Sequence, residues 1–437
     1  MNLKRRLFND LSRWARSGDR RPLLLRGARQ VGKTWAVEEW CRLESRKLVA
    51  INFEEQPQFA RLFEADLNVQ RIVDETSLAF DASFASPGTV LFFDEIQKAP
   101  KALTALRYFY EKRPDIVIVA AGSLVEFVLE EAGLPVGRVQ SKFVYPLSFV
   151  EFLGAVGKPG LARAIEGFDI DSPESFSDVI HGELLSALRL YFQVGGMPKV
   201  IRAYLENREL RAAANEQSIL VRGYVDDFRK YAKTADWDLL EIIFQKMGVI
   251  AGGAAVKFST IDSHAKSVQV RRALLALEKA LIVHKIRPTQ AKALPLAVHA
   301  KDKNFKLAFL DIGLLHHLVG FDWTKLDPTD LTDVADGRFA EQFVAQEIIT
   351  ARSDVDHYRL HHWSRDQPGS EAEVDFVVEH NNRPAPVEVK SGKRGRLRSL
   401  DLYLQETKAP VGYVLSQRNV ERLDNVTFLP LYLAGRL

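Results

Sequence analysis

The sequence predicts an α/β protein with a parallel sheet in its first third, a mainly helical middle and a second sheet near its C-terminus. The first third holds four short apolar runs with helical segments between them, at residues 23–25, 48–53, 90–93 and 116–121. Strands that alternate with helices favour a parallel sheet covered on both faces. Residues 179–244 are mostly helical in pattern. Strand patterns return at residues 371–379, 386–389 and 411–415.

Length and composition indicate a globular protein of several domains. The chain has 437 residues, of which 46% are apolar and 27% charged, with a net charge of +3. This charge does not indicate a globally basic nucleic-acid binder, although a local basic patch remains compatible with it. At roughly 100–200 residues per domain, the length predicts two to four domains. From the change of pattern along the chain we expect four parts, at residues 1–155, 156–245, 246–295 and 296–437.

Several features favour a cytoplasmic protein without a membrane segment. The single cysteine, Cys41, cannot form an intramolecular disulfide, which fits a reducing compartment. The most apolar stretch, residues 116–129, is shorter than the roughly 20 residues of a membrane span. The N-terminus has basic residues but no apolar core of a signal peptide. A cytoplasmic location is therefore the expectation.

A glycine-rich loop follows the first predicted strand and matches the pattern GxxxxGK[ST]. It consists of Gly27, Ala28, Arg29, Gln30, Val31, Gly32, Lys33 and Thr34. Glycines let the backbone wrap closely around phosphates, and the amides of such a loop and of the next helix point at negative charge. We expect Lys33 to reach the β- and γ-phosphates of ATP and Thr34 to bind Mg²⁺. The flanking strand and helix argue against a chance glycine turn.

Two carboxylates stand at the end of another buried strand. Residues 90–93 are followed directly by Asp94 and Glu95. Ligands bind at the carboxyl edge of parallel strands, so Asp94 is expected in the Mg²⁺ shell. Glu95 is expected to position and polarise the attacking water, which indicates hydrolysis rather than binding alone. Apolar strands that end in Asp-Glu are often structural, but the preceding loop favours the catalytic interpretation.

Two further side chains are weaker candidates for the same site. Ser123 follows the strand at 116–121, where a hydroxyl can contact the γ-phosphate or the water; the alternative is an ordinary turn serine. Arg138 lies in a loop and can present its guanidinium to a phosphate of its own chain or of a neighbour. The alternative for Arg138 is a surface arginine. A role in a neighbour's site would imply a homo-oligomer.

The chain resembles bacterial and archaeal AAA-type ATPases fused to a DUF4143 domain. The resemblance rests on the segments GARQVGKT, VLFFDEIQKAP, YPLSFVEFL, YFQVGGMPKVI, KLAFLDIGLL and residues 337–392. It implies an N-terminal P-loop NTPase domain that uses ATP and Mg²⁺. By this resemblance Ser123 matches the sensor position, and Arg138 matches a sensor or finger arginine.

Residues 246–295 predict a winged-helix-like module. Ser259 is expected to cap a helix over 260–264, and a second helix carries one apolar stripe, formed by Val270, Leu274, Leu277 and Leu281. Residues 281–286 are expected to begin a β-wing. Such a module can place its second helix in a DNA groove. Because few basic residues lie opposite the stripe, packing or protein contacts are the favoured alternative.

A cluster of carboxylates and a lysine lies near the C-terminus. Glu388 and Lys390 are two residues apart, so a strand directs both to one side. A hairpin is expected to bring Asp375 beside them, and Glu341 can approach from a helix. This layout resembles the PD-(D/E)xK nuclease core, a restriction-endonuclease-like fold, which implies Mg²⁺ or Mn²⁺ bound by Asp375 and Glu388. Lys390 would activate water, and Glu341 would complete the metal shell or steer a water.

These motifs lead to three hypotheses for function. The first is an ATP-hydrolysing protein that processes nucleic acid through a metal-dependent nuclease-like domain, in defence or mobile-element biology. The second is an ATP-dependent switch whose C-terminal domain is non-catalytic and recruits a partner. The third is an ATP-regulated DNA-binding protein that does not cleave. Within the C-terminal cluster, catalysis and a purely stabilising or partner-binding role stay open.

Overall fold

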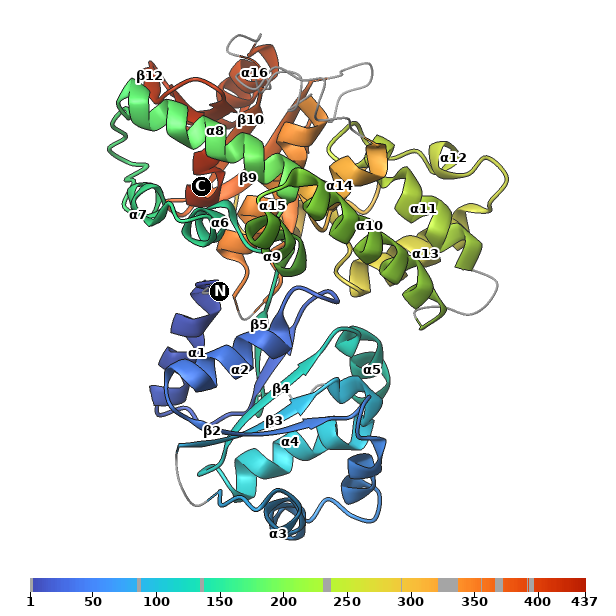
Figure 1. The fold of residues 1–437 in the computed structure, drawn as a ribbon. Helices are drawn as coiled ribbons and strands as arrows, with labels where there is room; N and C mark the ends of the chain where they lie inside the picture. The colour runs from blue at the N-terminus through green and yellow to red at the C-terminus, as the bar shows by residue number, and fades with distance from the viewer. Residues whose placement is uncertain are drawn as a thin grey trace. The chain divides into compact units, whose positions relative to one another are not determined.

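The computed structural model divides the chain into two compact units (Figure 1). It describes residues 3–84, 88–133, 137–230, 237–291, 293–320, 337–354, 356–365, 372–390, 392 and 397–437. The N-terminal unit comprises Lys4–Tyr145 and the later segment Ser353–His357. The C-terminal unit comprises Pro146–Arg352 and Tyr358–Leu437, together with Leu3 near the N-terminus. Among the helices of the described residues, none is both long and apolar enough to cross a membrane.

The N-terminal unit contains a five-stranded sheet in which every neighbouring pair of strands is parallel. In spatial order its strands are β2 (Lys47–Asn52), β3 (Thr89–Asp94), β4 (Val117–Gly122), β1 (Leu23–Arg26) and β5 (Gln140–Phe143). The predicted parallel sheet is confirmed. Strands β3 and β4 are buried along their whole length, which explains why both are continuous apolar runs in the sequence.

Helices connect these strands and cover the sheet. They are α1 (Arg6–Arg16), α2 (Lys33–Leu43), α3 (Val69–Phe80), α4 (Pro100–Lys112) and α5 (Val125–Ala132), with 3₁₀ turns η1 (Pro57–Phe63) and η2 (Ile96–Lys98). The ring of Phe93 on β3 packs against Phe53, Phe63 and Phe109, with centroids 5.7, 5.7 and 6.2 Å away. Burying a side chain of this size contributes about 2–3 kcal/mol, so the strand that ends at Asp94 is firmly placed.

The first part of the C-terminal unit is helical, as the periodicity predicts. Its helices are α6 (Phe149–Ala155), α7 (Pro159–Glu166), α8 (Asp178–Val194), α9 (Pro198–Asn207), α10 (Leu210–Asp227), η3 (Phe228–Lys230), α11 (Trp237–Ile250), α12 (Phe258–Ile261) and α13 (Ser267–Lys279). Later helices are η5 (Leu296–His299), α14 (Ile312–Val319), α15 (Gly337–Arg352), α16 (Arg398–Thr407) and η7 (Leu431–Arg436).

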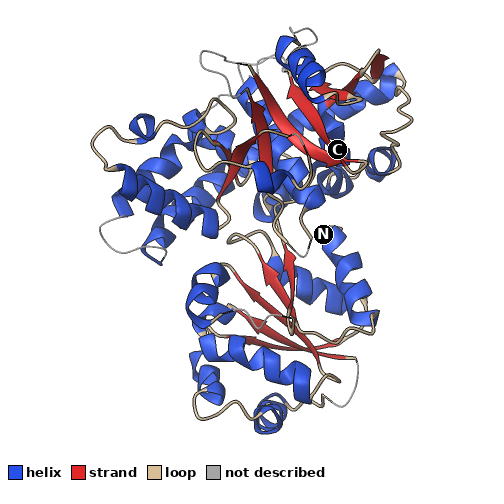
Figure 2. Cartoon of the chain, turned by 180° about the vertical axis from the view of Figure 1, so that it is seen from behind, coloured by secondary structure: helices blue, strands red, loops and turns tan. Residues whose placement is uncertain are grey.

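An eight-stranded mixed sheet forms the centre of the C-terminal unit (Figure 2). In spatial order its strands are β12 (Glu421–Leu423), β13 (Val426–Pro430), β11 (Gly412–Ser416), β10 (Arg383–Val389), β9 (Glu373–His380), β8 (Leu360–Ser364), β6 (Val283–Thr289) and β7 (Lys306–Phe309). The predicted hairpin is present, because β9 and β10 are antiparallel neighbours. Its turn places Asn381 and Asn382 at φ 47° and 57°, a conformation that asparagine tolerates well.

The winged-helix-like expectation differs from the structure in three places. Helix α12 ends at Ile261 instead of His264, because the Asp262 side chain accepts bonds from His264 N and Ala265 N and so begins a turn. Its N-cap is Lys257 rather than Ser259. The strand expected to begin a wing is β6, which pairs with β7 and with β8. It therefore belongs to the large sheet, and no separate wing forms from it.

Buried hydrogen bonds join two of the sequence motifs in the C-terminal unit. The Asp311 carboxylate caps α14 by accepting from Leu314 N, and it also accepts from Gly196 N at 2.6 Å. A Cβ atom on Gly195 would lie 2.3 Å from Asp311 Oδ1, so only glycine allows this approach. Burial raises the pKa of Asp311 to about 6 against the opposing effect of its backbone donors. The glycines of the segment YFQVGGMPKVI thus leave room for the aspartate of the segment KLAFLDIGLL, and the two segments pack directly against each other.

Polar side chains of α15 extend this network to the surrounding backbone. Gln342 accepts from Phe309 N at 2.6 Å and donates to Phe309 O at 2.8 Å. Gln346 accepts from Ile312 N at 2.9 Å. Buried polar groups need hydrogen-bond partners. A structural role therefore explains why these glutamines occur in the segment 337–392, without any catalytic role.

Candidate functional site

The glycine-rich loop connects β1 to α2 at the carboxyl edge of the parallel sheet. A Cβ atom on Gly27 would lie 2.2 Å from Val144 O, so a side chain is excluded there. Gln30 and Gly32 have positive φ angles of 64° and 89°. These two left-handed residues reverse the chain before α2 begins at Lys33. The loop therefore encircles the space in front of the helix N-terminus, where phosphate groups bind in such motifs.

Lys33 lies inside the loop. Its Nζ donates to Gly27 O at 2.9 Å and to Ala28 O at 2.8 Å, and the residue is only 6% exposed. Burial lowers the pKa of Lys33 to about 8, although the charges of Glu95 and Asp94 act in the opposite direction. A triphosphate at this position would favour the charged ammonium, because an opposite charge nearby raises a lysine pKa.

Thr34 and Asp94 are in direct contact. The Thr34 hydroxyl donates to Asp94 Oδ2 at 2.8 Å, and Asp94 Oδ1 accepts from Glu95 N at 3.0 Å. Burial raises the pKa of the Asp94 carboxyl, and the Thr34 hydrogen bond lowers it. A hydroxyl and a carboxylate side by side are oxygen ligands of the kind that Mg²⁺ prefers. The residues present thus fit the Mg²⁺ ion that accompanies ATP.

Glu95 is held by a side chain that the sequence analysis missed. Glu95 has a positive φ of 49°, and its carboxylate accepts a hydrogen bond from Gln97 Nε2. A Cβ atom on Gly122, the last residue of β4, would lie 2.2 Å from Gln97 Oε1. Ser123 follows Gly122 directly. Gln97 therefore connects Glu95 with the strand end that precedes Ser123, on the edge of the sheet where the loop lies.

A second residue outside the predicted set is Arg5, which precedes α1. Its guanidinium donates to Val31 O at 3.1 Å and to Tyr145 O at 2.7 Å, and the residue is buried. Arg5 therefore fixes the glycine-rich loop to the segment that follows β5. The sequence carries only a basic residue before an amphipathic helix, and that signal does not reveal the contact.

Arg138 lies away from the other candidates of its own chain. It precedes β5, and β5 runs parallel to β1. Arg138 is therefore at the amino edge of the sheet, opposite the edge that carries Lys33. Its Nε is 3.2 Å from Glu111 Oε1 near the end of α4. The structure does not bring Arg138 to the nucleotide site of the same chain.

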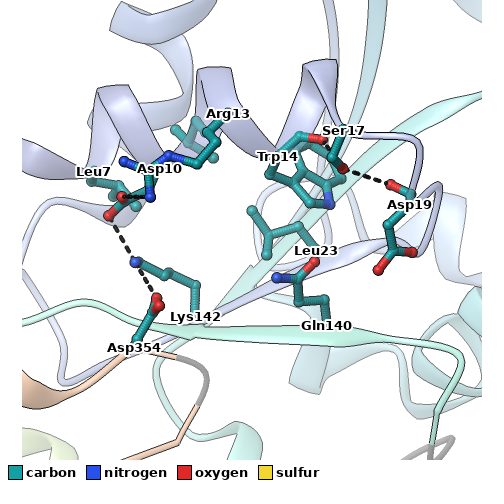
Figure 3. Close-up of a pocket in the computed structure, with 11 residues that line it drawn as sticks. Leu7, Asp10, Arg13, Trp14, Ser17, Asp19, Leu23, Gln140, Lys142 and Asp354 are labelled. Carbon is teal, nitrogen blue, oxygen red and sulfur yellow. Dashed lines mark hydrogen bonds and ion pairs between the residues drawn. The ribbon is translucent and has the colours of Figure 1, made fainter.

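A pocket of about 300 Å³ lies at this amino edge (Figure 3). Leu23 and Gln140, which begin β1 and β5, line it together with residues of α1. Within it, Lys142 forms ion pairs with Asp10 and Asp354. Because Leu23 stands at the opposite end of β1 from the glycine-rich loop, this pocket is separate from the candidate nucleotide site.

The C-terminal cluster assembles largely as the residue spacing predicts. Lys390 Nζ donates to Glu388 Oε1 at 2.6 Å, so these two side chains project together. Asp375 Oδ2 accepts from Val389 N at 2.8 Å, which places Asp375 beside them. Glu388 is 6% exposed, and its Oε2 atom is buried without a hydrogen-bond partner. Burial and, to a smaller extent, the charge of Asp375 raise the pKa of Glu388 to about 7, although the hydrogen bond from Lys390 acts in the opposite direction.

Lys306, on β7, also enters this cluster, which the sequence analysis missed. Its Nζ is 3.2 Å from Glu341 Oε2 and 3.5 Å from Asp375 Oδ1. It also forms an ion pair with Glu373. Burial by itself lowers the pKa of Lys306, but the charges of the three carboxylates outweigh it, so its pKa is raised. Glu341 and Asp375 therefore meet around an ammonium group.

The acidic residues of this cluster do not fit a bound metal ion. Among the described residues, no group of three or more His, Cys, Asp or Glu side chains is placed to hold one. Two of the three carboxylates expected around the metal, Glu341 and Asp375, are paired with Lys306. The Lys306 ammonium lies where their oxygen atoms converge, so the cluster is already neutralised in part by the protein itself.

Two adjacent histidines on β8 are buried, and one of them, His362, lies beside Glu373 of this cluster. His361 and His362 are both buried, and neither ring nitrogen of His361 has a hydrogen-bond partner. His362 Nε2 lies 3.2 Å from Asn304 O. Burial, followed by nearby positive charge, lowers the pKa of each histidine to about 4 from the ordinary 6.5. Both rings are therefore neutral in the folded protein at pH 7.

We expect the C-terminal unit to lose stability in mild acid because of these rings. A pKa that is lower in the folded state contributes stability that is present above pH 6.5 and lost as the pH falls through about 4. For His361 the loss is on the order of 3 kcal/mol. The unfolding midpoint in urea should fall less steeply between pH 7 and 4 in His361→Phe than in the wild type. Equal slopes would contradict the assignment.

Comparisons with known proteins identify domains along the chain. Residues 19–153 match the AAA domain family (AAA_14), residues 185–325 match a domain of unknown function, DUF8612, and residues 336–434 match DUF4143. No curated protein matches the chain.

Two solved structures are similar to parts of the chain. The Walker-type ATPase paby2304 of Pyrococcus abyssi is 15% identical, with a TM-score of 0.45, over 73% of this chain and 96% of that chain. PCH-2 of C. elegans is 16% identical, with a TM-score of 0.27, over 50% of this chain and 61% of that chain. At these scores neither likeness supports a conclusion about function. The domain matches show that the chain contains an AAA domain and a DUF4143 domain, as the sequence motifs predict.

Proposed function

We propose that the N-terminal unit binds ATP with Mg²⁺ and hydrolyses it. The contact between the Thr34 hydroxyl and Asp94 Oδ2, at 2.8 Å beside the loop that holds Lys33, carries this proposal. The match of this region to the AAA domain family supports it. Release of phosphate from ATP that requires Mg²⁺ is the test.

Each residue of the proposed site has a separate task. The amides of residues 27–34 and the Lys33 ammonium bind the phosphates, while Thr34 and Asp94 hold Mg²⁺. When bound, Mg²⁺ would neutralise part of the phosphate charge. Glu95 orients the attacking water, and Ser123 stands on the same edge to contact water or the γ-phosphate. Any arginine finger from Arg138 would have to come from a second copy of the chain.

For the C-terminal unit we propose a non-catalytic role. In this role it recruits a partner, and the ATP cycle of the N-terminal unit switches the protein between conformations. The convergence of Asp375, Glu388 and Lys390 supports the nuclease-like interpretation of the sequence. The Lys306 ammonium between Asp375 and Glu341 argues against the metal on which that activity would depend. The proposed role of this unit therefore includes no cleavage of nucleic acid.

The exposed face of α13 favours a protein as this partner. Arg271 and Arg272 are exposed there, but so are Val268 and Leu275, at 69% and 43%. Nucleic-acid backbones are bound by dense basic surfaces, and a face on which two arginines stand beside two apolar side chains is not densely basic. Nucleic acid remains the alternative partner, with a defence or mobile-element role as its biological setting.

A cleavage assay separates the two roles of the C-terminal unit. We expect no cleavage of single- or double-stranded DNA or RNA by the wild-type protein with Mg²⁺ or Mn²⁺, with or without ATP. Asp375→Asn should hydrolyse ATP at the wild-type rate, because Asp375 belongs to the other unit. Cleavage that requires a divalent cation and disappears in Asp375→Asn would establish a nuclease and overturn the non-catalytic proposal.

A further inference from the structure

Lys306 is the centre of the C-terminal carboxylate cluster. Its side chain is only 3% exposed, and three carboxylates from α15 and β9 surround its Nζ. An ammonium group has three N–H donors. Glu341, Glu373 and Asp375 supply one acceptor each, so all three donors are used within the protein.

Carboxylate oxygens are also the ligands that hard divalent cations prefer. Mg²⁺, Mn²⁺ and Ca²⁺ bind several carboxylate oxygens that converge on one point. A divalent cation at this position would have to displace the ammonium or lie beside it. Two like charges a few ångströms apart in a buried place repel strongly. The lysine and a metal ion therefore compete for the same carboxylates.

A further carboxylate oxygen beside the cluster has no hydrogen-bond partner. Glu388 Oε2 is buried and has no hydrogen bond, whereas its other oxygen is bound by Lys390. Asp375 lies on β9 next to Glu388 on the paired strand β10, and its charge raises the pKa of Glu388. With Lys306 absent, Asp375, Glu341 and Glu388 would offer oxygen atoms that no other cation of the cluster fully neutralises.

We propose that Lys306 is a resident cation that takes the place of a divalent metal in the C-terminal unit, and that its removal opens a divalent-cation site at Glu341, Asp375 and Glu388. The inference rests on the proposed non-catalytic role of this unit and deepens it, since it gives a physical reason for a carboxylate cluster that works without a metal. It also explains why four acidic residues can stay together in a buried part of the fold.

The test is Mn²⁺ binding by the full chain without nucleotide, measured by electron paramagnetic resonance. Asp94→Asn is present in every sample to silence the ATP site. Lys306→Met keeps the length of the side chain and removes its charge. We expect this variant to bind about one Mn²⁺ per chain at least about tenfold more tightly than the protein with Lys306.

Two controls make the result specific. Lys285, on the neighbouring strand β6, is also largely buried, and it pairs with Glu278 at 2.7 Å outside the cluster. Lys285→Met should bind Mn²⁺ no better than the protein with both lysines. Adding Asp375→Asn to Lys306→Met should remove the gained site. Gain of the site in Lys285→Met, or its survival in the double variant, would overturn the inference.

The remaining outcomes are also decisive. If Lys306→Met is unfolded without metal, recovery of its folded circular dichroism spectrum with Mn²⁺, but not with K⁺, supports the inference, and failure to recover overturns it. Equally tight, Asp375-dependent Mn²⁺ binding with Lys306 in place would also overturn it.

The two earlier proposals fail by different measurements. Nucleic-acid cleavage by the wild type would overturn the non-catalytic proposal, and absent phosphate release would overturn the ATPase proposal.

Discussion

Replacing Glu95 by glutamine is expected to lower the rate of ATP hydrolysis by about 100-fold or more while ATP binding changes little. A carboxylate that orients and polarises water contributes about 10²–10⁴-fold to a rate. The substituted amide would keep the shape of the side chain, and its oxygen could still accept a bond from Gln97 Nε2. Thr34, Asp94 and the glycine-rich loop would be unchanged, so the nucleotide should still bind. Phosphate release and binding of a fluorescent ATP analogue measure the two effects.

A matched variant separates this effect from a general loss of charge. Glu64 is an exposed carboxylate of the same unit, paired with Lys101 at 2.8 Å. Glu64→Gln should hydrolyse ATP at the wild-type rate. Lys33→Ala should lose ATP binding as well as hydrolysis, because we propose that the ammonium binds the phosphates directly. Unchanged hydrolysis in Glu95→Gln would show that another group activates the water.

The second large effect is expected in the C-terminal unit. Gln342→Ala should lower the free energy of unfolding by about 2–4 kcal/mol, because it leaves Phe309 N and Phe309 O buried without partners. A buried backbone group that loses its partner costs about 1–3 kcal/mol. The side chain makes both bonds at 2.6 and 2.8 Å and is completely buried. Urea denaturation monitored by circular dichroism measures the loss.

Gln245 supplies the control for this variant. It lies on helix α11, is exposed, and donates only to Glu241 one turn earlier, at 2.9 Å. Gln245→Ala removes the same atoms from a helix surface and should change the free energy of unfolding by no more than about 0.5 kcal/mol. Equal losses in both variants would mean that the buried network of α15 does not stabilise the unit.

The sequence predicted the features that depend on neighbouring residues. The glycine-rich loop and the Asp94-Glu95 strand end are short motifs whose spacing reflects a local backbone path, and the structure brings Thr34 and Asp94 into contact. The β9–β10 hairpin was also predictable, because Asn381 and Asn382 form its turn. In each case the informative residues lie within one strand, turn or helix start.

Features that depend on contacts between distant segments were not predictable. Lys306 precedes an apolar run and carries no sign that three carboxylates of α15 and β9 will surround it. Arg5 reaches the glycine-rich loop from outside the motif. The strand expected to begin a wing belongs to the large sheet instead. This could not be predicted, because its partner β8 comes much later in the chain. Likewise, Arg138 could be assigned to an edge of the sheet only once the strand directions were known.

The most direct test of the central claim is phosphate release from ATP by the wild-type protein, with Mg²⁺ and with EDTA, beside Glu95→Gln. We predict turnover that requires Mg²⁺ and falls by about 100-fold or more in the variant, although both proteins bind ATP. Binding of ATP by the wild type without phosphate release, or turnover that persists in Glu95→Gln, would contradict the assignment of Thr34, Asp94 and Glu95 to a hydrolytic site.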